Sequence, residues 1–208
     1  MTRPGAPRVC VFLDWQNLYH RAREAFIEPG APAAAGQVDP LALGRLCASK
    51  VPAGVLTGVR VYRGRPSRHH DGRSYSAFRR QTERWLHAGE GLVALAALDL
   101  RYPREWPLRP AQEKGVDVAL AVDFVLMCVR REYDVGILFS GDTDLVPALE
   151  AVLSLRPGEP PACEVAAWAP PAGRPRSLAV RGVQLRRHLL GEADFRAVAD
   201  LTDYGRGR

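Results

Sequence analysis

Two carboxylates stand one residue apart in the segment Ser140-Gly141-Asp142-Thr143-Asp144, directly after the apolar run 135–139. A strand that ends in a small residue, a glycine and paired acids is a typical way for a parallel sheet to present a divalent metal to solvent. Carboxylate oxygens without neighbouring His or Cys favour Mg²⁺ or Mn²⁺, which prefer oxygen ligands and retain several waters. The segment therefore predicts a metal site.

Asp14 is a third acid at the end of a strand, because it closes the apolar run 9–13. Burying an unpaired carboxylate is costly, so Asp14 needs a cation or a hydrogen-bond donor. Two roles are open for it: a metal ligand, and the N-cap of a helix that starts at Trp15, a role worth about 1 kcal/mol. We favour metal ligation, because Asp142 and Asp144 offer partners for a shared ion.

Asp117 opens a long helix predicted over 116–131, and Ala121 and Phe124 share its side of that helix. Asp123 falls on a different face, so the two acids cannot both point into one site. We favour Asp117 as the active-site acid and Asp123 as a surface or supporting residue. Lys114, just before this helix, either neutralises a phosphate or stays solvated, and both roles are open.

Pro147 limits where the next helix begins, because proline fits only into the first turn of a helix. This predicts Asp144 as the N-cap, with the positive end of the helix dipole keeping the nearby acids ionised. Asp142 and Asp14 are then the safer metal ligands.

Apolar runs alternate with helical patterns along the chain, which predicts an α/β fold: a three-layer α/β/α sandwich with a mainly parallel central sheet. In such sheets, ligands bind at the carboxyl ends of the strands, near the point where the strand order reverses. Strands are predicted over 8–13, 58–63, 91–100, 135–139 and 163–168. Helices are predicted over 15–28, 41–50, 74–87, 116–131 and 145–155.

The length of 208 residues suits one domain. We expect a disordered tail over 1–7, a folded domain over 8–169 and an extension over 170–208, with a helix at 193–201 that packs on the domain. The four cysteines are scattered, so no disulfide framework or zinc site is predicted. No membrane-spanning run or signal peptide is found, and a cytoplasmic protein is expected.

The net charge of +6 is concentrated between residues 60 and 87, where eight arginines face two acids and the rest of the chain is neutral. Aromatic residues are interleaved with these arginines, which is typical of a surface that binds phosphates and stacks bases. The other interpretation is an ordinary solvated helix face. The predicted contacts for a nucleic acid are Arg63, Arg65, Arg68, Arg73, Arg79 and Arg80.

Three segments in order, 12–18, 114–117 and 140–145, closely resemble the corresponding motifs of bacterial NYN domains, a branch of the PIN-like ribonuclease fold. The resemblance extends over about residues 8–168. It implies that the acidic cluster of the family is formed here by Asp14, Asp117, Asp142 and Asp144, with Asn17 and Ser140 as supporting polar residues. The family usually has a small residue after the first Asp, whereas this chain has Trp15, which is expected to reshape the pocket.

The resemblance implies a ribonuclease in which the four acids hold Mg²⁺ or Mn²⁺ for hydrolysis of a phosphodiester of RNA, which is expected to be single-stranded. Two other functions are considered. A non-catalytic RNA-binding module would keep the fold and the arginines and use the acids structurally. A haloacid-dehalogenase-like phosphatase needs an acid two residues after its nucleophile, and position 16 is Gln.

Overall fold

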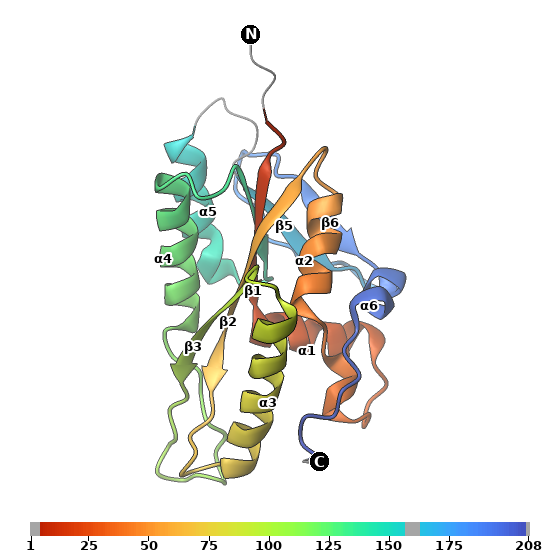
Figure 1. Ribbon diagram of the computed structural model, residues 1–208, viewed down its shortest axis with the longest axis vertical. Helices are drawn as coiled ribbons and strands as arrows, with labels where there is room; N and C mark the ends of the chain where they lie inside the picture. The colour runs from red at the N-terminus through yellow and green to blue at the C-terminus, as the bar shows by residue number, and fades with distance from the viewer. Residues whose placement is uncertain (1–4, 157–162, 207–208) are drawn as a thin grey trace.

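The computed structural model describes residues 5–156 and 163–206 (Figure 1). Of the tail predicted over 1–7, residues 1–4 lie outside the described residues, whereas the carbonyl of Pro7 accepts a hydrogen bond from the Val55 N–H at 2.9 Å. The strands are β1 (Arg8–Asp14), β2 (Val55–Arg65), β3 (Val93–Asp99), β4 (Val135–Phe139), β5 (Cys163–Trp168) and β6 (Arg187–Leu190). The helices are α1 (Trp15–Phe26), α2 (Pro40–Ser49), α3 (Gly72–Ala88), α4 (Val116–Val129), α5 (Val146–Leu155) and α6 (Glu192–Val198), with 3-10 turns η1 (Ala33–Gly36) and η2 (Thr143–Leu145).

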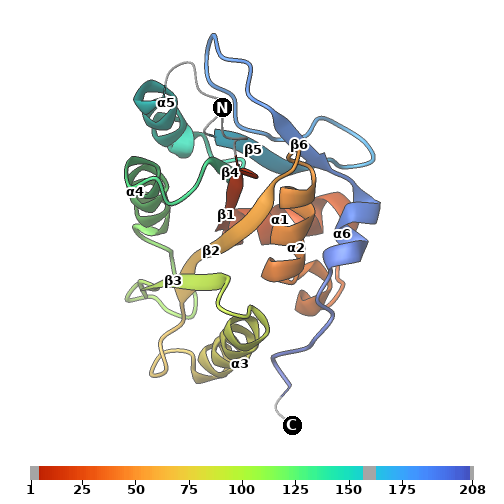
Figure 2. The same ribbon diagram turned by 45° about the horizontal axis from the view of Figure 1, so that its top comes forward.

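The strands form one six-stranded sheet in the order β3-β2-β1-β4-β5-β6, and every described pairing is parallel. Helices α1, α2, α3 and α6 cover one face, while α4 and α5 cover the other (Figures 1 and 2). The predicted three-layer α/β/α sandwich is therefore confirmed. The strand order reverses between β1 and β4, so the carboxyl ends of these two strands form the edge where such sheets bind ligands.

Strand β1 lies at the centre of the sheet and alternates its side chains between the two cores. Val11 and Leu13 pack toward α1 and α2, whereas Cys10 and Phe12 pack toward α4. The alternation continues to Asp14, which falls on the α4 side. The register of β1 therefore directs Asp14 toward the helix that carries Asp117.

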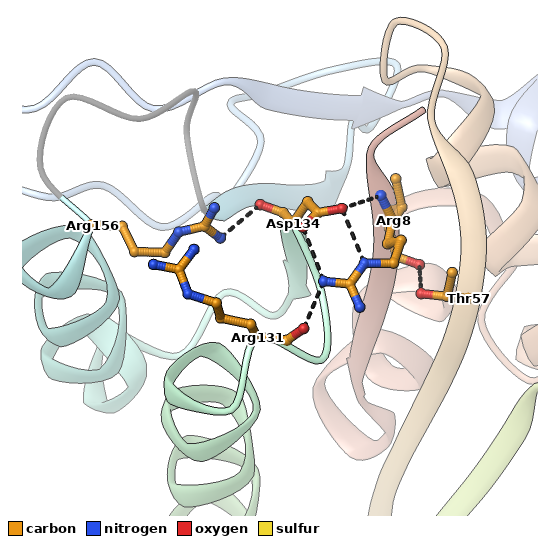
Figure 3. A network of polar contacts seen from close by, with 6 residues as sticks. Arg8, Thr57, Arg131, Asp134 and Arg156 are labelled. Atoms are coloured by element: carbon orange, nitrogen blue, oxygen red, sulfur yellow. Dashed lines mark hydrogen bonds and ion pairs between the residues drawn. The ribbon is translucent and has the colours of Figure 1, made fainter. Parts of the chain in front are cut away.

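The amino ends of β1 and β4 are held together by a polar network (Figure 3). Arg8 donates from its backbone N–H to Asp134 at 2.8 Å, and its side chain forms an ion pair with Asp134 at 3.0 Å. The N–H of Asp134 donates back to the carbonyl of Arg8 at 2.8 Å, and Arg156 donates to the carbonyl of Asp134 at 3.2 Å. Because both ion-pair partners are exposed, the network contributes more to strand alignment than to stability.

The segment beyond residue 169 contributes a strand that the sequence analysis did not predict. β6 pairs in parallel with β5, and α6, which is shorter than the helix predicted over 193–201, packs against α2. A buried contact joins the two strands, because His188 on β6 bonds to Glu164 on β5 and both side chains are 2% exposed. The boundary proposed at residue 169 thus falls between two strands of one sheet.

The four cysteines are buried and free. None of the helices described is both long and apolar enough to cross a membrane.

Candidate active site

Asp14 occupies the centre of the candidate site, at the carboxyl end of β1. It is only 4% exposed and caps α1, because one carboxylate oxygen accepts a hydrogen bond from the Asn17 N–H at 3.2 Å. The other oxygen accepts one from the Ser140 hydroxyl at 2.7 Å. The capping role is therefore present, and each oxygen keeps a lone pair for a further partner.

Ser140 joins the two halves of the site across the switch point of the sheet. Its hydroxyl donates to Asp14 and accepts from the Asp142 N–H at 3.0 Å. The side-chain oxygen of Asn17 accepts a hydrogen bond from the Gly141 N–H at 3.0 Å. Ser140 and Asn17 thus hold the loop after β4 against the start of α1.

Asp142, and not Asp144, caps the turn that leads into α5, which corrects the expectation drawn from Pro147. The Asp142 carboxylate accepts a hydrogen bond from the Asp144 N–H at 3.0 Å, because η2 precedes the first residue of α5, Val146. The 3-10 turn moves the cap two residues upstream. Asp144 is exposed, and its carboxylate accepts no hydrogen bond from the described residues.

Asp117 and Glu113 approach the same edge of the sheet from the start of α4. Asp117 lies in the first turn and is half-buried, and Gly115 with φ of 81° turns the chain into the helix. Glu113 accepts a hydrogen bond from the Gly64 N–H, near the end of β2, at 2.6 Å. Sequence reasoning missed Glu113, because a single glutamate in a loop carries no periodic signal. Its closeness to Asp14 follows from the position of β2 beside β1, because Asp14 pairs with Tyr62, two residues before Gly64.

The acids of this edge repel one another. The pKa of Asp14 is raised to about 6, first by burial and then by Asp117 and Glu113, while the hydrogen bonds from Ser140 and Asn17 oppose the shift. The pKa of Asp117 is raised by burial, by Asp142 and by Asp144. Burial and Asp117 also raise the pKa of Glu113. The four predicted acids and Glu113 therefore form one electrostatic cluster that favours a proton or a cation.

The donor set suits a hard cation, since all five side chains offer carboxylate oxygens. Within the described ranges, however, no group of three or more His, Cys, Asp or Glu side chains is assembled tightly enough to hold a metal ion. The predicted four-acid set is thus gathered at one edge but is not a preformed cage. Mg²⁺ often binds through one or two carboxylates and keeps its remaining waters, so the chemistry of the donors still fits.

Two residues near the acids have separate roles. Lys114 is exposed and forms no ion pair with any described residue. Asp123 accepts a hydrogen bond from the Tyr62 hydroxyl at 2.8 Å and is not among the acids that shift Asp14 or Asp117. Asp123 therefore stands outside the cluster, on the same helix as Asp117.

The six predicted RNA-contacting arginines fall into different environments. The Arg63 guanidinium lies over the rings of Trp15, Phe78 and Trp85 and donates to Gln81 at 2.7 Å. Burial lowers the pKa of Arg63 to about 10. We therefore assign Arg63 to packing under α3 and leave it out of the proposed RNA surface.

Arg80 also serves the fold, because it donates to the carbonyl of Tyr204 at 3.0 Å and so holds the C-terminal segment on α3. Arg65 and Arg79 form exposed ion pairs with Asp99 and Glu83. The exposed residues Arg68 and Arg73 lie in the loop after β2 and at the start of α3, at the same edge of the sheet as the acids. A hollow of about 530 Å³ is lined by Arg68, Gly72, Tyr75, Ser76, Arg79, Arg80 and Glu83.

A pocket of about 430 Å³ lies beside the acids on the β2 side, and Trp15 and Glu113 line it. Trp15 is 5% exposed and packs on Trp85 with ring centroids 4.3 Å apart. This large side chain thus forms part of the wall of the pocket.

Residues 8–156 match the family model of the NYN domain. The chain belongs to the NYN family. NYN domains are part of the PIN-like nuclease superfamily. The three motifs over 12–18, 114–117 and 140–145 all fall within the residues that match the family model.

This NYN protein matches no curated protein. Among solved structures, it is similar to a protein of unknown function from Vibrio parahaemolyticus, with 17% identity and a TM-score of 0.49. The match covers 81% of this chain and 84% of that one.

Proposed function

We propose that this NYN protein is a metal-dependent ribonuclease that hydrolyses phosphodiesters of single-stranded RNA at the acidic cluster. The observation that carries the proposal is the Ser140 hydroxyl, which bonds at once to Asp14 and to the backbone of Asp142 across the switch point of the sheet. It ties together acids from two strands at the edge where parallel sheets bind ligands. Membership of a nuclease family supports the same reaction.

Asp14, Asp117, Asp142 and Asp144 are the residues proposed to hold Mg²⁺ or Mn²⁺. When bound, such an ion acidifies a water molecule and neutralises charge on the phosphate. Ser140 fixes the orientation of the Asp14 carboxylate, and Asn17 holds the loop that carries Asp142. Asp144, which is exposed and has no partner among the described residues, can accept a proton or a water hydrogen.

The second candidate function is an RNA-binding NYN module without turnover. It is favoured by one observation, that no compact metal-binding group is assembled within the described residues. The two functions differ in one measurement, because the module binds RNA and never cleaves it.

Replacing Asp142 or Asp117 by Asn is expected to lower the rate of RNA cleavage at least about 100-fold, the size of loss commonly seen when one charge-stabilising group is removed from an active site. The matched control is Asp123→Asn, on the same helix as Asp117 but bonded to Tyr62 outside the cluster. Cleavage of labelled single-stranded RNA, double-stranded RNA and DNA is measured with Mn²⁺ or with EDTA.

Cleavage that survives EDTA, or that is equal in Asp117→Asn and Asp123→Asn, contradicts the proposed mechanism. RNA binding by a wild-type protein that never cleaves in Mn²⁺ supports the binding module instead.

The double variant with Arg68→Gln and Arg73→Gln is expected to bind single-stranded RNA less tightly and with a smaller salt dependence. Removing one arginine–phosphate interaction lowers the slope of log affinity against log salt by about 0.7. The control is Arg45→Gln, because Arg45 is exposed and pairs with Glu90, which precedes β3 at the other end of the sheet. Equal slopes for the double variant and the wild type would remove these arginines from the RNA surface.

A further inference from the structure

A pocket of about 300 Å³ lies beside the acidic cluster, on the side of β4 and β5. Asn17, Ser140 and Gly141 connect it to the candidate active site. Arg174 and Arg176 also line it, and they belong to the loop that follows β5. That loop lies beyond residues 8–156, the part of the chain that matches the NYN family model.

The loop after β5 packs directly on the loop that carries Asp142. A Cβ atom added at Gly141 would come within 2.9 Å of the backbone oxygen of Arg176. Real side chains do not tolerate such a distance from backbone, so Gly141 lets the two loops meet. Arg176 is therefore placed beside the active-site loop by the backbone itself.

The charged groups that line this pocket leave an excess of positive charge. Glu24 is the one carboxylate among them, and it already pairs with Arg21 at 2.6 Å. Arg174 and Arg176 are exposed and form no ion pair with any described residue. Arg176 lies near enough to Glu24 to lower the pKa of that carboxylate, but this single acid faces Arg21, Arg174 and Arg176, so an excess of positive charge remains.

Asn17 adds a neutral donor to the same pocket. Its side-chain oxygen accepts from the Gly141 N–H, whereas its side-chain NH₂ donates to no described residue. A guanidinium pair and an amide donor around one hollow match the hydrogen-bonding needs of a phosphate group.

An RNA strand at the acidic cluster meets strong repulsion, because its phosphates and the five carboxylates have the same sign of charge. Positive charge beside the acids offsets this repulsion. We propose that the pocket of Asn17, Arg174 and Arg176 binds a phosphate group of the RNA strand, next to the phosphate that is cleaved. The identity of the ligand as RNA rests on the proposed function, whereas the anion site rests on the side chains described.

The test is the affinity of metal-free protein, in EDTA, for a labelled single-stranded RNA of twelve nucleotides. The double variant with Arg174→Gln and Arg176→Gln is expected to bind about tenfold more weakly, and its salt slope is expected to fall by about 1.4, or 0.7 for each arginine. Both side chains are exposed, so the variant is expected to fold. The matched control is Arg181→Gln, an exposed arginine of the same segment that does not line the pocket.

An unchanged affinity and slope in the double variant, or an equally large decrease in the Arg181→Gln control, would overturn the phosphate site. The same RNA with and without a 5′-phosphate assigns the bound group: equal affinities place an internal phosphate in the pocket, and a preference for the phosphorylated strand places its end there.

The result is independent of catalysis. If the wild-type protein binds RNA through these arginines and never cleaves it, the phosphate site is supported and the nuclease is contradicted. A protein that cleaves RNA, and that binds the RNA in EDTA equally tightly after both arginines are replaced, supports the nuclease and contradicts the phosphate site.

Discussion

Replacing Asp14 by Asn is expected to stabilise the metal-free protein and to abolish its RNA cleavage. Asp14 is buried among other acids, and its pKa is raised from the ordinary value of 3.8 to about 6. Asparagine keeps the cap on α1 and a hydrogen bond with Ser140 but carries no charge. The gain in free energy of unfolding at neutral pH is up to about 3 kcal/mol, since each unit of pKa shift corresponds to roughly 1.4 kcal/mol.

The dependence on pH has a definite sign. Because the folded protein binds the Asp14 proton more tightly than the unfolded chain, the stabilising contribution of protonated Asp14 is fully present below the ordinary pKa of 3.8 and is lost as pH rises through about 6. The advantage of Asp14→Asn over the wild type is therefore absent near pH 4 and complete near pH 7. Urea denaturation in EDTA across this range measures it.

Asp39→Asn is the matched control, because Asp39 caps α2 through the Ala42 N–H at 2.7 Å and lies next to Val198, outside the acidic cluster. It is expected to gain no stability at neutral pH and to retain cleavage. A loss of stability in Asp14→Asn at pH 7 would show that the buried carboxylate is stabilising as it stands. Millimolar Mg²⁺ or Mn²⁺ is expected to raise the melting temperature of the wild type and not of Asp14→Asn.

The second large effect is expected at the buried contact between Glu164 and His188. His188→Leu leaves Glu164 without its partner in a site where both side chains are 2% exposed. Removing one member of a buried pair costs about 3–5 kcal/mol, whereas replacing both by apolar residues is often nearly neutral. The free energy of unfolding of His188→Leu is therefore expected to fall well below that of the wild type. The double variant with Glu164→Leu and His188→Leu is expected to lie close to the wild type.

Limited proteolysis of the same variants tests where the domain ends. We propose that the chain from 170 onward folds with the NYN domain, because β6 is hydrogen-bonded to β5. His188→Leu is then expected to unfold in one transition with the rest of the protein. Release of the C-terminal segment while the remaining domain stays folded would instead support a separate extension beyond residue 169.

The features that could be predicted from the sequence are those that depend on where the strands end. Asp14 and Ser140 each follow an apolar run, and the parallel arrangement brings such ends to one edge, so the alternation of elements predicted both the fold and the acidic edge. β6 was missed because its four residues include an arginine and a histidine, a pattern that does not stand out as a strand.

Other features required the three-dimensional structure. Glu113 joins the cluster through the Gly64 N–H, a contact between a loop and a strand far apart in sequence. The cap at Asp142 depends on a 3-10 turn that the position of Pro147 alone does not reveal. Arg63 and Arg80 have the charge of RNA contacts, but aromatic rings surround the first and the carbonyl of Tyr204 binds the second.

The contacts between Arg8 and Asp134 have a consequence for the opposite edge of the sheet. They set Val9 beside Val135, and the same pairing continues to Leu13 beside Phe139, one residue before Asp14 and Ser140. A slip of one residue would displace the two side chains by about 3.3 Å and turn one of them to the other face. The alignment of the two strands at their amino ends therefore determines, some five residues later, whether the Ser140 hydroxyl and the Asp14 carboxylate meet.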